Sequence, residues 1–529
     1  MRNRIRMLAG VLVAVATLSA CTAASAAQQP APAEKKPNIV YFLVDDMSAD
    51  LLQYMDTVKS LADGGARFDN YFVSNSLCCP SRASMFTGEH PHNTGVLTNK
   101  GTDNGGYEAF KKHEGRTYAA ALHDARYRTG YLGKYINEYT LPADYHVPQG
   151  WDEWHAGSGG AYNEFQYQVS QYIREENKRE IGDGGGKYFT DLLGDRAVNF
   201  IERSRQHAPD RPFFLQVAAF SPHSGVKNPD DKEPLFPPAI RDRPKDRWPG
   251  GEFPHGDCGG PDCRAQDLTK LPAFDEDTSD KPSWVRREPL AGDEKLIQAL
   301  RNDFRNRIRM VQSIDDAVAR VLSSLNEAEK NNTYFVFTSD NGFHLGQHRL
   351  MRGKTTAYDH DVRVPMLVKR PQSAQGGTSV RGEIVQNVDL FATFLDIAGV
   401  RPELRDSRDG RSLLPMINGQ TPPNWRNAAL IEHVTPNPNA PGEVDPDAQR
   451  AGGNSNPPTY QAVRLPHELY VEYANAQKER EYYDMSTDPN QETNKPNDPR
   501  AGQLAGPLRT LANCGQPDAP DCWTASHIG

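Results

Sequence analysis

One eleven-residue stretch of the sequence combines a nucleophile, an anion-stabilising helix end and an arginine. It runs Cys78-Cys79-Pro80-Ser81-Arg82-Ala83-Ser84-Met85-Phe86-Thr87-Gly88. Pro80 suits the first position of a helix and Gly88 suits the residue just past its end, so we expect about two helical turns between them. The side chain of residue 78 would then lie at the positive end of the helix, within reach of the Arg82 guanidinium. This arrangement indicates chemistry on an anionic group.

Acidic and amide side chains follow two segments that are typical of buried parallel strands. Residues 37–44 and residues 333–338 are short apolar runs rich in β-branched and aromatic residues. Ligands bind at the carboxyl ends of such strands, although an isolated Asp-Asp pair is also compatible with a solvated turn. Adjacent carboxylates need a cation to stay ionised, and an all-oxygen set favours a hard divalent ion, Ca²⁺ or Mg²⁺. The side chains in question are Asp45, Asp46, Asp340 and Asn341.

The stretch from residue 78 to residue 88 resembles the signature of the type I sulfatases, in the alkaline phosphatase superfamily. The resemblance implies that Cys78, and not Cys79, is oxidised to Cα-formylglycine, whose hydrated aldehyde is the nucleophile. It also implies that calcium is the ion. On the residues alone, two adjacent cysteines are also compatible with a buried pair or a metal site. The family's metal ligands match Asp45, Asp46, Cys78, Asp340 and Asn341 in this chain.

Further motifs of that family are matched later in the chain. Residues 126–135 resemble its second signature and place Lys134 at an active-site lysine. Pro222-His223 and Arg352-Gly353-Lys354-Thr355 match a histidine and a second lysine. By this resemblance Arg82 holds the nucleophile, and the other three side chains bind sulfate and protonate the leaving oxygen. Those three are Lys134, His223 and Lys354.

Three more residues are candidates for the substrate pocket. Asn137 stands where many members of the family have histidine, and the Gly-Lys-Tyr-Ile-Asn form is similar to the N-acetylglucosamine-6-sulfatase branch. His155 could replace that histidine, but a packed surface histidine fits the sequence equally well. His344 belongs to a Phe-His-Leu-Gly-Gln-His run that the family shares.

The order of the segments predicts an α/β protein with two structured parts. We expect a large, mixed but mostly parallel sheet between helices, as in alkaline phosphatase, in residues 37–415, and a smaller α+β unit on an antiparallel sheet in residues 416–529. Residues 224–290 have little periodicity and read as a substrate-shaping insertion. Cys258 and Cys263 within it are a candidate disulfide, as are Cys514 and Cys522 near the end.

The N-terminal residues are expected to direct export. Residues 1–27 combine a basic start with an apolar run too short to span a bilayer, and residues 28–36 form a linker. Leu18-Ser19-Ala20-Cys21 resembles a lipoprotein box that would leave Cys21 lipidated, whereas Ala24-Ser25-Ala26 is an ordinary cleavage site. The product would be a bacterial cell-surface lipoprotein or a periplasmic or secreted protein. A membrane contact would be made only through that lipid.

Together these features predict an exported sulfatase of sulfated sugars or aryl sulfates. Its partners would be a sulfated small molecule or glycan and, during biogenesis, a sulfatase-maturation enzyme. The net charge of −9 over 529 residues gives no reason to expect nucleic acid. Two alternatives stay open: a phosphonate monoester or phosphodiester hydrolase of the same superfamily, and an inactive glycan-binding lipoprotein. The sequence names neither the sugar, nor the sulfate position, nor exo or endo action, nor the oligomeric state.

Overall fold

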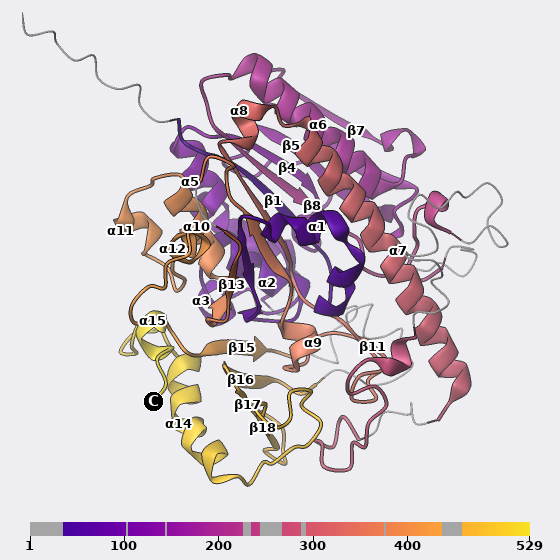
Figure 1. Ribbon diagram of the computed structural model, residues 1–529, viewed down its shortest axis with the longest axis vertical. Coiled ribbons are helices and arrows are strands. Elements are labelled where there is room, and N and C mark those ends of the chain that lie inside the picture. The colour runs from indigo at the N-terminus through magenta and orange to yellow at the C-terminus, as the bar shows by residue number, and fades with distance from the viewer. Residues whose placement is uncertain are drawn as a thin grey trace, which may run out of the picture. The chain divides into compact units, whose positions relative to one another are not determined.

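A ten-stranded mixed sheet forms the centre of the protein (Figure 1). The computed structural model describes residues 35–101, 104–142, 145–225, 234–243, 267–286, 292–374, 377–435 and 457–529. The strand order is β13-β2-β12-β9-β1-β8-β4-β5-β6-β7. In chain order the strands are β1 (Asn38–Val44), β2 (Ala66–Phe68), β4 (Arg128–Gly133), β5 (Glu153–Gly159), β6 (Tyr167–Ile173), β7 (Lys178–Gly182), β8 (Phe213–Ala218), β9 (Thr333–Ser339), β12 (Met366–Lys369) and β13 (Ser379–Arg381).

The five middle strands, β9-β1-β8-β4-β5, are mutually parallel. Strand β1 is buried along its whole length and pairs in register with β8 and β9, so that Leu43 lies beside Ala218 and Thr338. Their carboxyl ends therefore meet at one edge. Antiparallel pairings begin on either side, at β12 and at β6. The expected mixed, mostly parallel sheet is confirmed.

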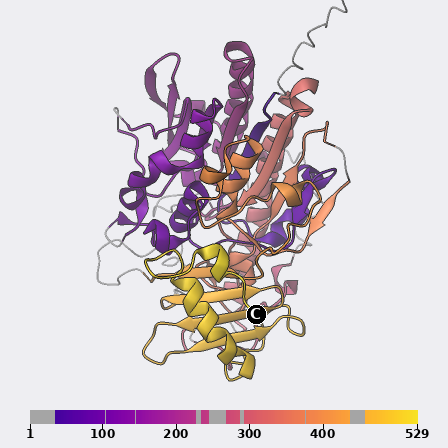
Figure 2. The same cartoon turned by 90° about the vertical axis from the view of Figure 1, so that its left-hand side faces the viewer.

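Helices cover both faces of the large sheet (Figures 1 and 2). The apolar residues of β1 divide between two cores: Val40 and Phe42 pack with the long helices α6 and α7, whereas Tyr41 and Leu43 pack with α2, α5 and α10. This alternation is the two-residue period of a strand buried on both faces. The helices are α2 (Cys78–Thr87), α5 (Tyr118–Asp124), α6 (Phe189–His207), α7 (Glu294–Ser324) and α10 (Asp389–Ile397).

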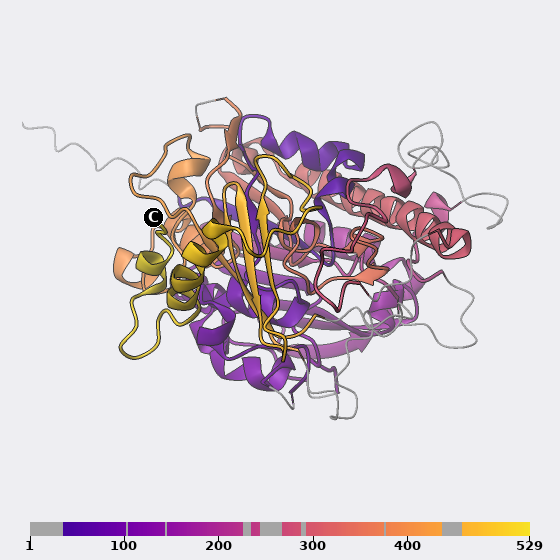
Figure 3. The same ribbon diagram turned by 90° about the horizontal axis from the view of Figure 1, so that it is seen from below.

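A second, antiparallel sheet follows in the C-terminal part of the chain, as expected. Its order is β15 (Ala429–His433), β16 (Tyr460–Leu465), β17 (Glu468–Tyr473) and β18 (Arg480–Asp484). Helix α14 (Pro499–Ala512) packs on it (Figure 2). The sheet lies beside the short helix α9 (Asp359–Val362) (Figures 1 and 3). Arg464 of β16 forms an ion pair with Asp359 of that helix.

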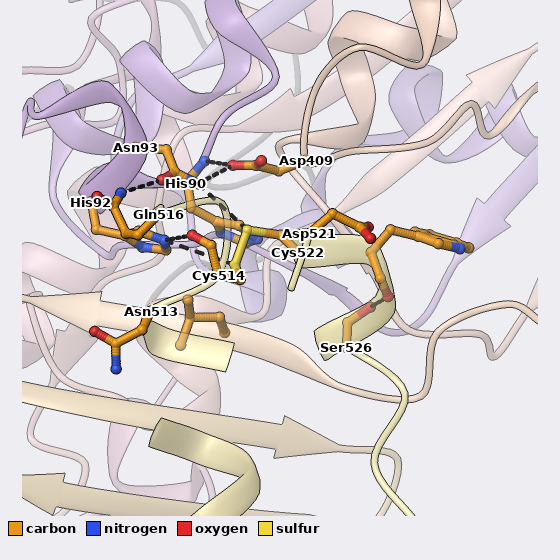
Figure 4. Close-up of a disulfide and its surroundings, with 12 residues drawn as sticks. His90, His92, Asn93, Asp409, Asn513, Cys514, Gln516, Asp521, Cys522 and Ser526 are labelled. Atoms are coloured by element: carbon orange, nitrogen blue, oxygen red, sulfur yellow. Dashed lines mark hydrogen bonds between the residues drawn. A yellow bond between two sulfur atoms is a disulfide. The ribbon is translucent and has the colours of Figure 1, made fainter. Parts of the chain in front are cut away.

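A disulfide joins Cys514 to Cys522 (Figure 4). The turn between α14 and α15 (Cys522–Ala525) lies against α3 (Pro91–Thr94), where His92 contacts the Cys514 carbonyl oxygen and Gln516 donates to Asn93. The other candidate pair, Cys258 and Cys263, lies outside the described residues, as do Cys21, the N-terminal segment and much of the insertion. Described parts of the insertion pack on the C-terminal sheet: Lys281 contacts the Tyr483 hydroxyl at 3.0 Å.

Helix α2 begins earlier than we expected. Its first residue is Cys78, not Pro80, and Leu77 precedes it as the cap. Proline is tolerated in the third position because the first N–H groups of a helix have no intrahelical partner. Gly88 ends the helix in the left-handed conformation, with φ of 74°, as predicted. The side chain of residue 78 therefore belongs to the first turn, in the positive end of the helix dipole.

Candidate active site

The carboxyl ends of four parallel strands bring the expected residues to one place. Strand β1 leads to Asp45 and Asp46, β9 leads to Asp340, β4 leads to Lys134, and β8 leads to the segment that carries His223. The backbone joins these ends, since the N–H groups of Asp340 and Lys134 bond to the carbonyl oxygens of Val44 and Ala218. Helix α2 then presents residue 78 to the same edge. The sheet and the start of one helix thus position these residues, and Lys354 joins them from a separate loop.

The thiol of Cys78 lies at the centre of this cluster. Its Sγ is 3.5 Å from Asp45 Oδ1 and 3.0 Å from Lys354 Nζ. Lys134 Nζ is 2.5 Å from the other oxygen of Asp45, and Lys354 Nζ is 2.7 Å from Asp46 Oδ1. Burial, followed by the charge of Asp45, raises the pKa of the Cys78 thiol above its ordinary value. The second cysteine, Cys79, faces away into the apolar core.

Arg82 crosses the cluster from the next turn of α2. Its Nε donates to Asp340 Oδ2 at 2.7 Å and its Nη1 donates to the Lys134 carbonyl oxygen at 2.7 Å. Both Arg82 and Asp340 are fully buried. Burial acts to raise the pKa of Asp340, but the charges of Arg82 and Lys134 outweigh it and hold that pKa below its ordinary value. The arginine therefore fixes one carboxylate and the lysine loop together.

Two buried oxygens in this cluster accept no hydrogen bond from the described residues. They are Asp46 Oδ2 and Asn341 Oδ1. The amide nitrogen of Asn341 donates to Asp46 Oδ1 at 2.7 Å, so its oxygen is turned elsewhere. Asp46 has a φ of 63°, a conformation that costs energy in residues other than glycine and that is frequent at functional sites. Unsatisfied hard oxygens beside three carboxylates are what a divalent cation would bind.

His223 lies on the other side of Asp46. Its Nε2 is 3.4 Å from Asp46 Oδ2, and its Nδ1 is 2.7 Å from the Ser224 carbonyl oxygen. Because a carbonyl only accepts, Nδ1 must carry a hydrogen. Tyr162 forms a wall here: its ring centroid is 4.6 Å from that of His223 and 5.0 Å from Lys134 Nζ.

The structure brings together Asp45, Asp46, Cys78, Arg82, Lys134, His223, Asp340, Asn341 and Lys354. The three candidates for the substrate pocket lie outside this group. Asn137 lies beside α2, where its backbone forms a hydrogen bond with Cys79. The Asn137 Oδ1 atom is buried and has no hydrogen-bond partner among the described residues. His155 is not in the cluster, because its ring nitrogens contact Glu153 and Arg196 on the α6 side of the sheet. His344 is hydrogen-bonded to Asp361 at 3.0 Å and pairs with Gly353, the residue before Lys354.

Two residues that contact this cluster or the loop of Lys354 were not predicted from the sequence. Arg307, in the middle of α7, donates to the Asp46 carbonyl oxygen. It sits on the buried face of that helix, three residues from Phe304 and four from Val311, and a charged residue at such a position is a usable signal. Asp361 accepts hydrogen bonds from both the N–H and the hydroxyl of Thr356, two residues after Lys354. No local pattern marks that contact.

The family model named Sulfatase matches residues 37–400. The chain belongs to the sulfatase family. It is a sulfuric ester hydrolase with the fold of the alkaline phosphatase superfamily, as its motifs indicated. Human N-acetylglucosamine-6-sulfatase is 30% identical over 512 residues, which cover 91% of this chain and 86% of that protein. An extracellular sulfatase SULF-1 homolog of Drosophila melanogaster is 34% identical over 409 residues, 75% of this chain but only 33% of that longer protein.

Solved structures agree with this assignment. The structure of BT4656 in complex with its substrate D-glucosamine-2-N,6-O-disulfate has 25% sequence identity and a TM-score of 0.65. The match covers 90% of this sulfatase and 97% of that chain.

Proposed function

We propose that this sulfatase hydrolyses sulfate esters of sugars, with formylglycine made from Cys78 as the nucleophile and Ca²⁺ as its ion. The observation that carries the proposal is the position of residue 78. Its side-chain atom lies within 3.5 Å of a carboxylate and a lysine, in a buried cluster where sulfate could be held on all sides. A hydrated aldehyde there would supply one hydroxyl for attack on sulfur and a second through which sulfate is released, whereas a thiol lacks the second.

The chain's own oxygens fit a calcium ion. Asp46 Oδ2 and Asn341 Oδ1 are buried and accept no hydrogen bond from the described residues, and Asp45 and Asp340 complete an all-oxygen set. Histidine and cysteine ligands, which would indicate zinc, are not the majority of this set. When bound, the cation would act as a Lewis acid on a sulfate oxygen. Mg²⁺ would use the same oxygens but demands a tighter octahedral geometry.

The charges of the cluster favour an anionic substrate. Three carboxylates, Asp45, Asp46 and Asp340, face three cations, Arg82, Lys134 and Lys354, so these six groups sum to zero. A divalent cation would leave a surplus of two positive charges. A sulfate monoester brings one negative charge, and more develops on its oxygens as the ester bond breaks. Preorganised positive charge of this kind is usually the largest catalytic term.

His223 is the best candidate to protonate the leaving sugar oxygen. The Nδ1–H group donates to the Ser224 carbonyl oxygen. When the ring is protonated, the second hydrogen is therefore on Nε2, which faces the cluster. Lys134 and Lys354 approach from two other strands and would bind the non-bridging oxygens of sulfate. Arg82 donates to the Asp340 carboxylate and to the carbonyl oxygens of Lys134 and Tyr135, so we assign it to positioning the nucleophile and Asp340.

For the substrate we propose a 6-sulfated glucosamine unit. The support is the Gly-Lys-Tyr-Ile-Asn motif ending at Asn137 and the two relatives whose names or bound substrate contain that sugar. Asn137 Oδ1, buried without a described partner, would accept from a substrate hydroxyl or amine.

Initial rates on defined sulfated mono- and disaccharides test these assignments. We expect release of sulfate from 6-O-sulfated glucosamine above all other members, and none from a Cys78→Ala variant. A tryptic peptide mass for residue 78 that corresponds to an aldehyde would support the modification. Equal rates for both proteins on every sugar, with a thiol mass, would leave only a glycan-binding protein. Faster turnover of paired phosphonate esters would instead favour the phosphonate or phosphodiester hydrolase.

We also propose that the protein is exported. The N-terminal segment supports this, together with relatives described as extracellular. None of the helices in the described part of the chain combines the length and apolar character that a membrane span needs. Palmitate labelling of the wild type but not of Cys21→Ser would identify the lipoprotein form, and equal absence of label would identify cleavage after Ala26. Labelling of both proteins would reject Cys21 as the lipid site.

A further inference from the structure

A basic cavity of about 440 Å³ lies between β6, α6 and α7. It shares no lining residue with the Cys78 cluster, and its volume is in the range of roughly 300–1,000 Å³ that is usual for small-molecule sites. Its lining includes one acidic side chain, Asp195, against four basic ones. The basic residues are Lys187, Arg196, Arg203 and Arg320.

Three of these four basic side chains, Lys187, Arg203 and Arg320, have a carboxylate partner. Asp195 is shared, since Lys187 and Arg320 each approach one of its oxygens to 2.5 Å. Glu153 lies behind the lining and binds Arg203 at 2.5 Å, but it also binds the buried Arg128 at 2.7 Å. Arg320 also approaches Asp191 at 3.7 Å, so the excess of positive charge in the lining comes from Arg196.

Arg196 carries the argument. Its Nη1 donates to His155 Nδ1 at 2.7 Å and to the Ser170 carbonyl oxygen at 2.9 Å. No carboxylate among the described residues lies within ion-pair distance of it. Because a guanidinium only donates, His155 Nδ1 must accept, and burial lowers the pKa of His155 to about 4, so this ring is neutral. Burial also lowers the pKa of Arg196 to about 10, which leaves it charged at neutral pH without a counterion.

The remaining walls suit a sugar. Ile173, Leu192 and Val198 give an apolar surface for the C–H face of a ring, and the amides of Gln171 and Asn199 can bond hydroxyls. We propose that this cavity is a second binding site for an anionic saccharide, with a sulfate or carboxylate group placed on Arg196. It would hold a neighbouring sugar chain independently of hydrolysis. A long nucleic acid is disfavoured by the overall negative charge.

Calorimetric titration with a trisulfated heparin disaccharide, at low ionic strength, tests the site. The protein is the full chain with Cys78→Ala, which prevents turnover. The cavity variants are Arg196→Gln and Lys187→Glu, and Arg196→Lys keeps the charge. Arg205→Glu is the matched control, because Arg205 lies on the same helix outside the cavity and pairs with Glu329. Circular dichroism checks that each variant is folded, and Lys187, which is largely exposed, should tolerate change.

We expect Arg196→Gln and Lys187→Glu each to weaken one binding event about tenfold or more, since a charge-assisted hydrogen bond or its charge is lost. Arg196→Lys and Arg205→Glu should stay within about threefold of the parent. Equal affinity and stoichiometry in the two cavity variants and in Arg205→Glu would overturn the site. Tighter binding of ADP than of the disaccharide would overturn its assignment to saccharides.

Discussion

Replacing Asp340 by asparagine measures how far the buried charges of the active site depend on one another. Asp340 Oδ2 accepts from Arg82 Nε at 2.7 Å, and both side chains have no exposed surface. Asparagine has almost the same size, so the change is mainly electrostatic. Removing one partner of such a buried pair costs about 3–5 kcal/mol, because the other charge stays buried, here with only the more distant Asp45, at 3.9 Å, to compensate it. We therefore expect the free energy of unfolding to fall by that amount.

The chain contains a control with the same geometry at the surface. Arg67 Nε is 2.8 Å from Asp69 Oδ1, but these side chains are 48% and 45% exposed. Exposed pairs contribute about 0–1 kcal/mol. Urea unfolding of Asp340→Asn and Asp69→Asn, followed by tryptophan fluorescence with EDTA present, compares the two directly. Equal losses would refute the reasoning, since burial would then make no difference to the cost.

A second measurement on the same variant separates stability from ion binding. A ligand that binds only the folded state stabilises it by about 2.7 kcal/mol at one hundred times its dissociation constant. Calcium should therefore raise the melting temperature of the wild type and of Asp69→Asn. We expect little or no rise for Asp340→Asn, because it lacks one of the proposed ligands. A full rise in that variant would remove Asp340 from the proposed calcium site.

Three further predictions concern the surroundings of the site. Lys354→Met should lower kcat about 10²–10³-fold with the fold intact, since it removes a charge from the transition state; a change in KM alone, in steady-state kinetics, would contradict this. Tyr460→Phe removes a hydrogen bond of 2.9 Å to the Thr355 carbonyl oxygen and should lower kcat several-fold, whereas Tyr470→Phe should not. Burial raises the pKa of Glu164 from 4.5 to about 7, so its ionisation opposes folding as pH rises through that interval. Glu164→Gln should therefore be more stable than the wild type by up to about 3 kcal/mol at pH 8 and equal below pH 4.5 in urea titrations, and an equal difference at both pH values would show that titration is not the cause.

The elements that hold the active site were largely predictable from the sequence. Strands β1 and β9 are continuous apolar runs, because they are buried on both faces, and such runs have few other interpretations. Gly88 marked the end of α2 because few other residues adopt its conformation cheaply. Apolar residues at helical spacing over residues 293–330 predict one helix, but α7 ends at Ser324, and Asn326 caps the separate helix α8 (Glu327–Lys330). The apolar period alone did not reveal that break.

Contacts between distant segments were not predictable in the same way. His155 is the third residue of β5, a strand of the large sheet. Its side chain points to α6, because alternate residues of a strand face opposite sides of the sheet. A shift of β5 by one residue would place His155 on the opposite face of the sheet, and the sequence does not determine that register. The pairing of Asp361 with Thr356 and the contact of Arg307 with Asp46 depend on loop conformations and on tertiary packing, for which the sequence carries no period.

The C-terminal sheet supports the active site through the loop that carries Lys354. The Thr355 N–H donates to the Ser76 carbonyl oxygen, and the Ser76 hydroxyl donates to the Thr356 carbonyl oxygen, which ties this loop to the segment just before residue 78. Tyr460 of β16 holds the same loop from the other side. Thr355 has a φ of 80°, an unfavourable conformation that these bonds must maintain. The position of Lys354, for which we propose a role in binding sulfate, therefore depends on the Tyr460 hydroxyl, more than a hundred residues later in the chain.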